Sequence, residues 1–91
     1  MLKAAYTKQF EKDLKLAQKR GKNLDKIKSI IEILLANKPL AISHRDHWLT
    51  GNYANRRECH VESDYLLVYK PIKNENMIIF ERLGTHSDLF I

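Results

Sequence analysis

The sequence predicts an α+β domain in which a short N-terminal strand and an antiparallel helical hairpin pack on a small, mainly antiparallel β-sheet. Two patterns lead to this prediction. Apolar residues follow a helical period in the first part of the chain, and strand-like patterns replace it from residue 53 onward. The 91 residues can bury only one hydrophobic core, so we expect a single domain spanning 1–91. Helices followed by a run of strands are typical of the α+β class.

The chain begins with a short apolar stretch, residues 2–6, that is expected to form an edge strand. Thr7 then offers an N-cap hydroxyl to a helix over residues 8–20. Gly21 is expected to end this helix, because glycine adopts the left-handed conformation at little cost. Apolar residues recur along the helix at spacings of four and three: Phe10, Leu14 and Ala17.

The second helix carries a clear apolar stripe, and Asn23 or Asp25 is expected to cap its start. Asn37-Lys38-Pro39 is expected to end it, since the residue before a proline is pushed out of the helical region. The link between the two helices is short, which favours an antiparallel hairpin. The stripe follows the spacing i, i+3, i+4, i+7, i+8: Ile27, Ile30, Ile31, Leu34, Leu35.

The C-terminal half is predicted to be a loop followed by strands. Residues 40–52 read as the loop, with Gly51-Asn52 as a turn signal. Hairpin-length connections then separate three strands, which favours antiparallel pairing. The expected strands span residues 53–61, 65–69 and 77–83, with connections at 62–64 and 71–76.

Charge is distributed unevenly along this basic chain, whose net charge is +5. Residues 1–45 carry eleven Lys and Arg against four acids, whereas residues 46–91 carry five against seven. A basic N-terminal surface suits a polyanion or an acidic protein partner. Composition alone, however, is explained better by a solvated pair of lysine-rich helices.

The single cysteine, Cys59, excludes an internal disulfide and fits a reducing compartment. No apolar run approaches the roughly 20 residues of a membrane span, and the N-terminus lacks the apolar core of a signal peptide. We therefore expect a cytoplasmic protein with no membrane partner. On a strand, Cys59 and its neighbour His60 point to opposite faces, which favours a packing role for the thiol.

Three of the four histidines lie at predicted element boundaries, where sites are commonly built: His47, His60 and His86. His44 lacks such a context and is interpreted as an ordinary surface residue. Asp64 follows His60 by four residues across a predicted tight turn. It could orient an imidazole, but spacing alone favours a turn residue that accepts backbone N–H groups.

Arg82 lies on the last predicted strand beside apolar residues, where an unpaired charge would be costly to bury. Two interpretations are equally supported: bidentate recognition of a phosphate, or an internal ion pair with Glu58 or Glu81. The histidines do not follow HExxH or a short zinc spacing, so a metal site is disfavoured and no cofactor is expected.

Metal-free acid–base chemistry by imidazoles with arginine support remains, because one imidazole can remove a proton near neutral pH while another donates one. Cleavage of RNA needs this pair of steps. A base takes the proton of the 2′-hydroxyl, the oxygen attacks the adjacent phosphate, a cation stabilises the charge that develops, and an acid protonates the leaving 5′-oxygen.

Four segments carry a resemblance to a known family: AQKRGK, DHWLTG, RECHVESDYLLVYK and FERLGTHSDLF. In order and spacing they resemble the motifs of the YafQ-type toxins of the RelE superfamily. The resemblance implies the RelE-like fold described above. It also implies a toxin of a bacterial type II toxin–antitoxin system that cuts mRNA in the A site of the translating ribosome. An antitoxin that binds operator DNA would neutralise it.

By the same resemblance, His47, His60, Asp64 and His86 match the acid–base positions, and Arg82 matches the phosphate-binding arginine. Two aromatic residues match substrate-positioning sites: Phe90, with stacking on a base as its physical rationale, and Tyr65, where relatives often carry tryptophan. Trp48 stands where proline is common in the family.

The resemblance also implies a role for the basic helices, as a surface for ribosomal RNA that an acidic antitoxin segment covers in part. Two other interpretations predict different behaviour. A non-catalytic RNA-binding or corepressor module would need the basic helices but not the histidines, and a metal-dependent nuclease would lose activity in chelator. The surface comprises Lys8, Lys12, Lys15, Lys19, Arg20 and Lys22.

Overall fold

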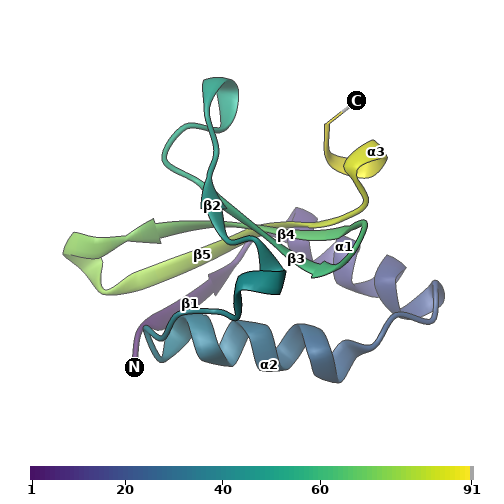
Figure 1. Ribbon diagram of the computed structural model, residues 1–91, viewed down its shortest axis with the longest axis horizontal. Coiled ribbons are helices and arrows are strands. Elements are labelled where there is room, and N and C mark those ends of the chain that lie inside the picture. Colours follow the sequence, from purple (N-terminus) through teal and green to yellow (C-terminus); the bar gives the residue numbers. More distant parts are fainter. Residues whose placement is uncertain (91) are drawn as a thin grey trace.

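The computed structural model describes residues 1–90 as a five-stranded sheet with two helices on one face and a short third helix on the other (Figure 1). The strand order is β1-β5-β4-β3-β2, in which β1 pairs with β5 in parallel and the other neighbours are antiparallel. The predicted α+β class is confirmed. The elements are β1 (Lys3–Tyr6), α1 (Lys8–Lys19), α2 (Leu24–Leu35), β2 (His47–Trp48), β3 (Arg57–Glu62), β4 (Tyr65–Ile72), β5 (Met77–Gly84) and α3 (His86–Leu89).

Both long helices begin at polar caps that the sequence predicts. The Thr7 hydroxyl accepts a hydrogen bond from the Phe10 N–H at 2.9 Å, and Asn23 Oδ1 accepts one from the Lys26 N–H at 3.1 Å. Each cap satisfies one of the backbone donors that a helix leaves unpaired in its first turn.

Left-handed residues end both helices, Gly21 with φ of 72° and Asn37 with φ of 57°. After each of them the chain forms the paired backbone hydrogen bonds of a Schellman motif. The second helix therefore ends at Leu35 because Asn37 turns the chain, and Pro39 lies beyond the end rather than causing it.

The stretch predicted as a loop, residues 40–52, contains the two-residue strand β2, whose His47 and Trp48 pair with Glu58 and Arg57 of β3. The prediction of a loop was wrong because so short a strand leaves no alternating pattern to detect. The expected strand start at residue 53 was also too early. The chain loops away from the sheet over residues 49–56 before β3 begins (Figure 1).

Strand β4 continues through Pro71 to Ile72, beyond the predicted end at Tyr69. A proline inside a sheet removes a backbone donor and is found mainly where a strand has a free edge. Here β3 pairs with β4 only as far as Tyr69, so Pro71 has β5 as its one neighbour in the sheet.

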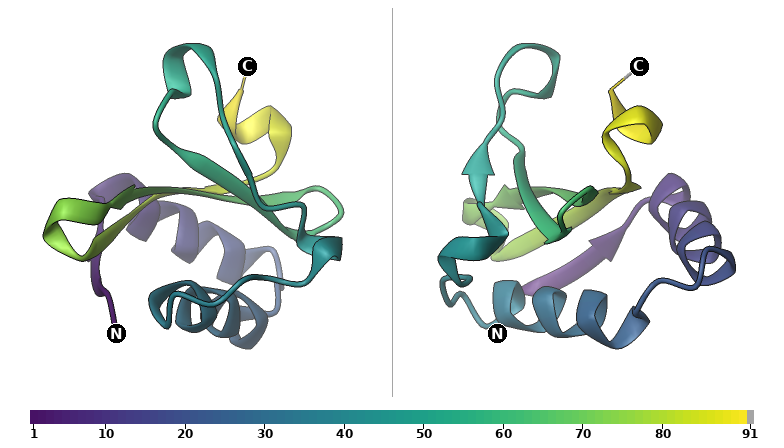
Figure 2. Two further views of the ribbon diagram at one scale, coloured as in Figure 1. Left: turned by 60° about the vertical axis from the view of Figure 1, so that its left-hand side comes forward. Right: turned by 45° about the vertical axis from the view of Figure 1, so that its right-hand side comes forward.

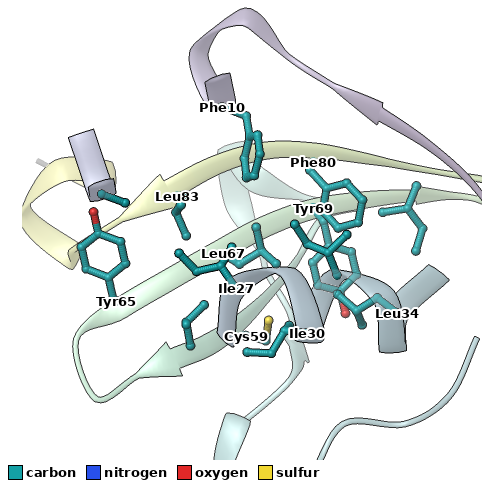
Figure 3. Close-up of a cluster of buried hydrophobic side chains, with 14 residues drawn as sticks. Phe10, Ile27, Ile30, Leu34, Cys59, Tyr65, Leu67, Tyr69, Phe80 and Leu83 are labelled. Carbon is teal, nitrogen blue, oxygen red and sulfur yellow. The ribbon is translucent and has the colours of Figure 1, made fainter. Parts of the chain in front are cut away.

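The main core fills the space between the sheet and the two long helices (Figure 3). Side chains from α1, α2 and three strands meet there and exclude water, which is the dominant favourable term in folding. This core includes Phe10, Ile27, Ile30, Leu34, Cys59, Leu67, Tyr69, Phe80 and Leu83.

A second, smaller apolar cluster lies on the opposite sheet face, where Leu66 and Val68 of β4 contact Leu89 of α3 and the partly buried Leu49. We call this side the open face. In Figure 2, α3 and the 49–56 loop project from it while α1 and α2 cover the other side. No helix within residues 1–90 has the length and apolar character to cross a membrane.

Candidate active site

The open face carries the candidate site because β3 alternates its side chains across the sheet. Cys59 and Val61 point into the main core, so Glu58 and His60 point to the open face. His47 of β2 stands opposite Glu58 in the strand register and shares that face. The sheet thus brings together side chains from two separate segments of the sequence.

Glu58 lies between two imidazoles. Its Oε1 is 3.6 Å from His47 Nε2 and 3.8 Å from His60 Nε2, and the Glu58 side chain is only 6% exposed. This buried carboxylate is therefore close enough to interact electrostatically with either imidazole. Sequence reasoning treated Glu58 only as a possible partner of Arg82. The alternation of Glu58 and His60 along one strand was the signal that could have identified it.

His86, the first residue of α3, pairs with Asp64 of the β3–β4 turn. The Nδ1 of His86 lies 2.9 Å from Asp64 Oδ1, and the backbone N–H of His86 donates to the same oxygen at 3.2 Å. These hydrogen bonds from His86 hold the pKa of Asp64 below its usual value. Of the two interpretations of Asp64, the structure therefore supports the one in which it orients an imidazole.

The imidazoles of His60 and His86 are neighbours, with ring centroids 6.1 Å apart. His47, His60 and His86 thus form a chain of groups on the open face, linked through Glu58 at one end and closed by Asp64 at the other. We call these three residues the histidine cluster.

Every Nδ1 in the histidine cluster faces an oxygen that can only accept. His47 Nδ1 is 2.5 Å from the Arg45 carbonyl, His60 Nδ1 is 3.3 Å from the Ser63 carbonyl, and His86 Nδ1 faces the Asp64 carboxylate. Each neutral ring must therefore carry its proton on Nδ1, which leaves Nε2 as the nitrogen that exchanges protons. The three rings are held in the same tautomer by three different parts of the chain.

Aromatic side chains border the cluster at the C-terminus. The Phe90 ring lies 6.0 Å from that of His86, and Tyr53 packs edge-on against Phe90 at 5.2 Å. The Tyr53 hydroxyl donates to the Leu89 carbonyl at 3.1 Å, so it also ties the 49–56 loop to α3. Sequence reasoning predicted a positioning role for Phe90 and missed Tyr53, which carries no motif of its own.

Arg82 is held by a carboxylate that was not among its predicted partners. Its Nε donates to Asp13 Oδ2 of α1 at 2.9 Å, and Asp13 also accepts from the Leu83 N–H. The predicted partner Glu81 pairs with Arg56 instead. The hydrogen bond that Arg82 donates to Asp13 raises the pKa of the Arg82 guanidinium. Its Nη1 has no hydrogen-bond partner within residues 1–90, so part of the guanidinium remains available to an anion.

Tyr65 does not reach the histidine cluster, and its prediction as a substrate-positioning residue needs correction. The residue is 1% exposed and its ring belongs to the core between the sheet and the helices. Lys22 Nζ lies 4.7 Å from the ring centroid, and the hydroxyl accepts a hydrogen bond from Arg20. Tyr65 therefore stabilises the junction of the two long helices with the sheet.

The predicted basic surface is only partly available to a partner. Arg20 forms a bidentate pair with Asp88 of α3, with distances of 2.6 and 3.2 Å. Lys22 lies 3.7 Å from Glu62. Of the six predicted residues, the four that lie on α1 are exposed and form no ion pair within residues 1–90: Lys8, Lys12, Lys15 and Lys19.

Other chemistries find little support on this face. Among residues 1–90 no three His, Cys, Asp or Glu side chains are arranged to hold a metal ion. Burial in the core raises the pKa of the Cys59 thiol to about 12, so it is not a nucleophile at neutral pH. The arrangement is suited to proton transfer between imidazoles oriented by oxygen acceptors.

Known proteins are similar to this chain in sequence and fold. The model of the bacterial YafQ toxin of type II toxin–antitoxin systems matches residues 2–91. The mRNA interferase toxin YafQ of Escherichia coli K12 is 43% identical over 86 residues, which cover 93% of this chain and 91% of the relative.

Two solved structures show the same fold over the whole chain. A metal-bound toxin from Helicobacter pylori has a TM-score of 0.94 and 42% identity, covering 99% of this chain and 100% of that one. YafQ in the Escherichia coli DinJ–YafQ complex has a TM-score of 0.91 and 40% identity, with both chains fully covered. The resemblance inferred from the sequence motifs is thereby confirmed, and the chain belongs to the YafQ family of bacterial toxins of type II toxin–antitoxin systems.

Proposed function

We propose that this toxin is an endoribonuclease that cleaves mRNA on the ribosome by metal-independent acid–base chemistry. The observation that carries the proposal is the common orientation of the histidine cluster, in which each Nδ1 lies against an acceptor and each Nε2 is left to exchange a proton, those of His47 and His60 beside Glu58. The relative named an mRNA interferase supports the choice of mRNA as substrate.

In the proposed reaction, one imidazole of the cluster takes the proton from the ribose 2′-hydroxyl. The freed oxygen attacks the adjacent phosphorus and the bond to the 5′-oxygen breaks, while a second imidazole gives that oxygen a proton. The products are a 2′,3′-cyclic phosphate and a 5′-hydroxyl. Glu58 and Asp64 stabilise the imidazolium forms that arise during the transfer.

Arg82 and Phe90 have supporting roles in this proposal. The part of the Arg82 guanidinium that Asp13 leaves available stabilises the negative charge that develops on the phosphate. The half-exposed Phe90 ring beside His86 offers a stacking surface for a base next to the cleaved bond.

We also propose the partners. The lysines of α1 contact ribosomal RNA, and a cognate antitoxin with an acidic segment and a DNA-binding part neutralises the toxin, as DinJ accompanies YafQ in the Escherichia coli complex. Translation takes place in the cytoplasm, so this function places the protein there.

The test is growth inhibition together with mapping of mRNA 5′ ends after induction, for the wild type and for His60→Ala and His86→Ala. Both variants should fold, as judged by circular dichroism, and should lose inhibition and cleavage by at least a hundredfold, since general acid–base groups contribute about 10²–10⁴-fold. Full toxicity of both variants would favour a non-catalytic RNA-binding or corepressor module.

Treatment with a chelator distinguishes the proposed mechanism from that of a metal-dependent nuclease. Adding a transition-metal chelator that spares the Mg²⁺ of the ribosome should leave cleavage unchanged and the cyclic phosphate in place. Loss of cleavage in the chelator, with recovery on adding metal, would contradict the metal-independent mechanism.

A further inference from the structure

A groove of about 420 Å³ adjoins the histidine cluster at the edge of the sheet. It lies between the 42–44 turn, the end of β3 and Lys26 of α2, and His60 is one of its lining residues. The groove therefore continues directly from the candidate site. Its lining residues are Lys26, Ser43, His44, Arg45, His60, Val61, Glu62 and Ser63.

The lining of this groove suits an anion. Lys26 of α2 and Arg45 contribute two cationic side chains, and neither forms an ion pair within residues 1–90. Glu62, the one acid of the lining, lies 3.7 Å from Lys22, which offsets its charge. Ser43 and Ser63 add hydroxyl groups that can donate hydrogen bonds to a phosphate oxygen.

Two backbone contacts connect the groove to the histidine cluster. His44 Nδ1 donates to the His60 carbonyl at 2.7 Å, so the 42–44 turn is attached to the strand that carries His60. The Arg45 carbonyl accepts the hydrogen bond that orients His47. His44, which sequence reasoning treated as ordinary, therefore belongs to the surroundings of the site.

Arg45 adopts a left-handed conformation, with φ of 48° and ψ of 45°. This conformation is uncommon for a residue other than glycine or asparagine, and such residues concentrate at functional sites. Here it directs the Arg45 carbonyl toward His47 while the Arg45 side chain lines the groove. Arg45 thus lines the groove and also orients the imidazole of His47.

We propose that the groove formed by Lys26, His44 and Arg45 is a subsite for the RNA phosphate next to the one that is cleaved. The proposal rests on the proposed function and adds a substrate contact to it. A phosphodiester is the anion proposed, because His60 belongs to both the groove and the cluster, so a strand whose reacting phosphate lies at the Nε2 atoms has neighbouring phosphates close to the groove. The subsite would fix the register of the strand without reading the base.

The test combines a protein change with a change in the RNA. Messenger RNA is prepared with an uncharged methylphosphonate linkage in place of each phosphate that flanks the cleaved bond, and its cleavage is measured on programmed ribosomes. For the wild type, one of the two substitutions should lower kcat/KM several-fold, mainly by raising KM. Lys26→Ala should show a similar loss on natural mRNA and little further loss on that modified RNA, because the two changes remove the same contact.

Lys28→Ala is the matched control, since Lys28 is exposed on the same helix but does not line the groove. It should cleave natural mRNA as the wild type does and should respond equally to the modified linkage. Arg45→Asn provides a second variant, because asparagine tolerates the left-handed conformation and removes only the cation. It should reproduce the behaviour of Lys26→Ala.

Two results would overturn the subsite. One is that Lys26→Ala and Arg45→Asn cleave natural mRNA as efficiently as the wild type. The other is that their losses add to that of the modified linkage, which would assign the lysine and the arginine to ribosomal RNA. In either case the proposed function stands if the wild type cleaves and His86→Ala does not. Absence of cleavage by the wild type would reject the function, and the subsite with it.

Discussion

Glu58 is a buried acid that contacts two members of the histidine cluster at once. With a side chain only 6% exposed, it can interact with an imidazolium more strongly than a solvated carboxylate can. Its neighbour Cys59 fills the core on the other side of the strand, which fixes the direction of the Glu58 side chain. The residue therefore has the geometry of a shared proton partner for His47 and His60.

Glu58→Gln removes this charge while keeping the size of the side chain. We expect the cleavage rate to fall by about 10²-fold, the lower end of general acid–base effects, with the fold retained. The measurement is the rate of mRNA cleavage together with the melting temperature.

Glu75→Gln is the control for Glu58, because Glu75 is exposed in the connection between β4 and β5, at the end of that hairpin opposite α3. It should change the rate less than threefold. A Glu58→Gln enzyme as fast as the wild type would show that the carboxylate takes no part in proton transfer.

The short helix α3 depends on tertiary contacts for its position, since four residues form no stable helix alone. Leu89 anchors it on the open face, and Arg20, which follows α1, holds Asp88 from the side. Gly84 permits the close approach, because a Cβ at that position would lie 2.9 Å from the Cβ of Asp88. These contacts set the place of His86 and Phe90 at the ends of the helix.

Asp88→Asn should loosen α3 and lower the cleavage rate at neutral pH several-fold, while the main core stays folded. The effect on stability has a defined pH dependence. The hydrogen bond from Arg20, helped by the Thr85 N–H, holds the pKa of Asp88 well below its usual range. A depressed carboxyl pKa stabilises the fold fully above the unfolded-state pKa of about 3.9, and this contribution is lost as the pH falls toward the folded-state pKa.

Thermal unfolding of wild type and Asp88→Asn should therefore differ most at neutral pH and converge progressively below about pH 4. Glu32→Gln, at an exposed position in the middle of α2, is the control for the loss of one surface carboxylate. A difference in melting temperature that stays constant down to pH 2 would contradict the assigned role of the Arg20–Asp88 pair.

Helix α1 is joined to β5 by Asp13, a buried carboxylate with 5% exposure. Asp13→Ala removes the partner of Arg82 and of the Leu83 N–H. We expect a loss of about 2 kcal/mol in the free energy of unfolding, because a buried donor and a partly buried cation are left unpaired. In a domain of this size that corresponds to a fall of roughly 10 °C in melting temperature.

Differential scanning calorimetry measures the effect of Asp13→Ala, with Glu32→Ala on the exposed side of α2 as the control that should change little. An Asp13→Ala protein as stable as the wild type would mean that water satisfies both groups. Asp13→Ala also frees Arg82 from its ion pair with Asp13. The cleavage rate of this variant therefore shows whether the ion pair restrains the arginine.

At the scale of the whole molecule, the sheet separates two surfaces. The histidine cluster lies on the open face, while α1, which carries the exposed lysines, lies on the other side of the sheet; Figure 2 shows the position of this helix. Lys8, Lys12, Lys15 and Lys19 recur at spacings of four and three, so they share one side of the helix. Such a stripe can bind the phosphates of a large RNA while the opposite face acts on a single strand.

Charge reversal at three of these positions, Lys12→Glu, Lys15→Glu and Lys19→Glu, should weaken ribosome association by at least about tenfold and reduce its dependence on salt, because fewer counterions are released. Sedimentation with ribosomes at several salt concentrations measures this. A triple variant of exposed lysines outside α1 is the control: Lys3→Glu, Lys38→Glu and Lys73→Glu. If both triple variants associate with ribosomes equally well, the lysines of α1 do not contribute to ribosome binding.

The sequence by itself determined the two long helices, their caps at Thr7 and Asn23, the α+β class and the motifs that identify the family. These features depend on residues close together in the chain, where helical period and capping chemistry act locally. It also determined that Glu58 and His60 share one side of a strand. The apolar run of Tyr65 to Tyr69 gave no such information, because both faces of β4 are buried.

Only the tertiary structure decided which distant groups meet. Strand β2 is two residues long and is defined by its pairing with β3, which brings His47 to Glu58. Arg82 finds Asp13 across 69 positions of sequence, although nearer acids were available. Tyr65 faces the helices because the sheet presents that side to the main core. In each case the partner is chosen by packing and register, which no local pattern of residues records.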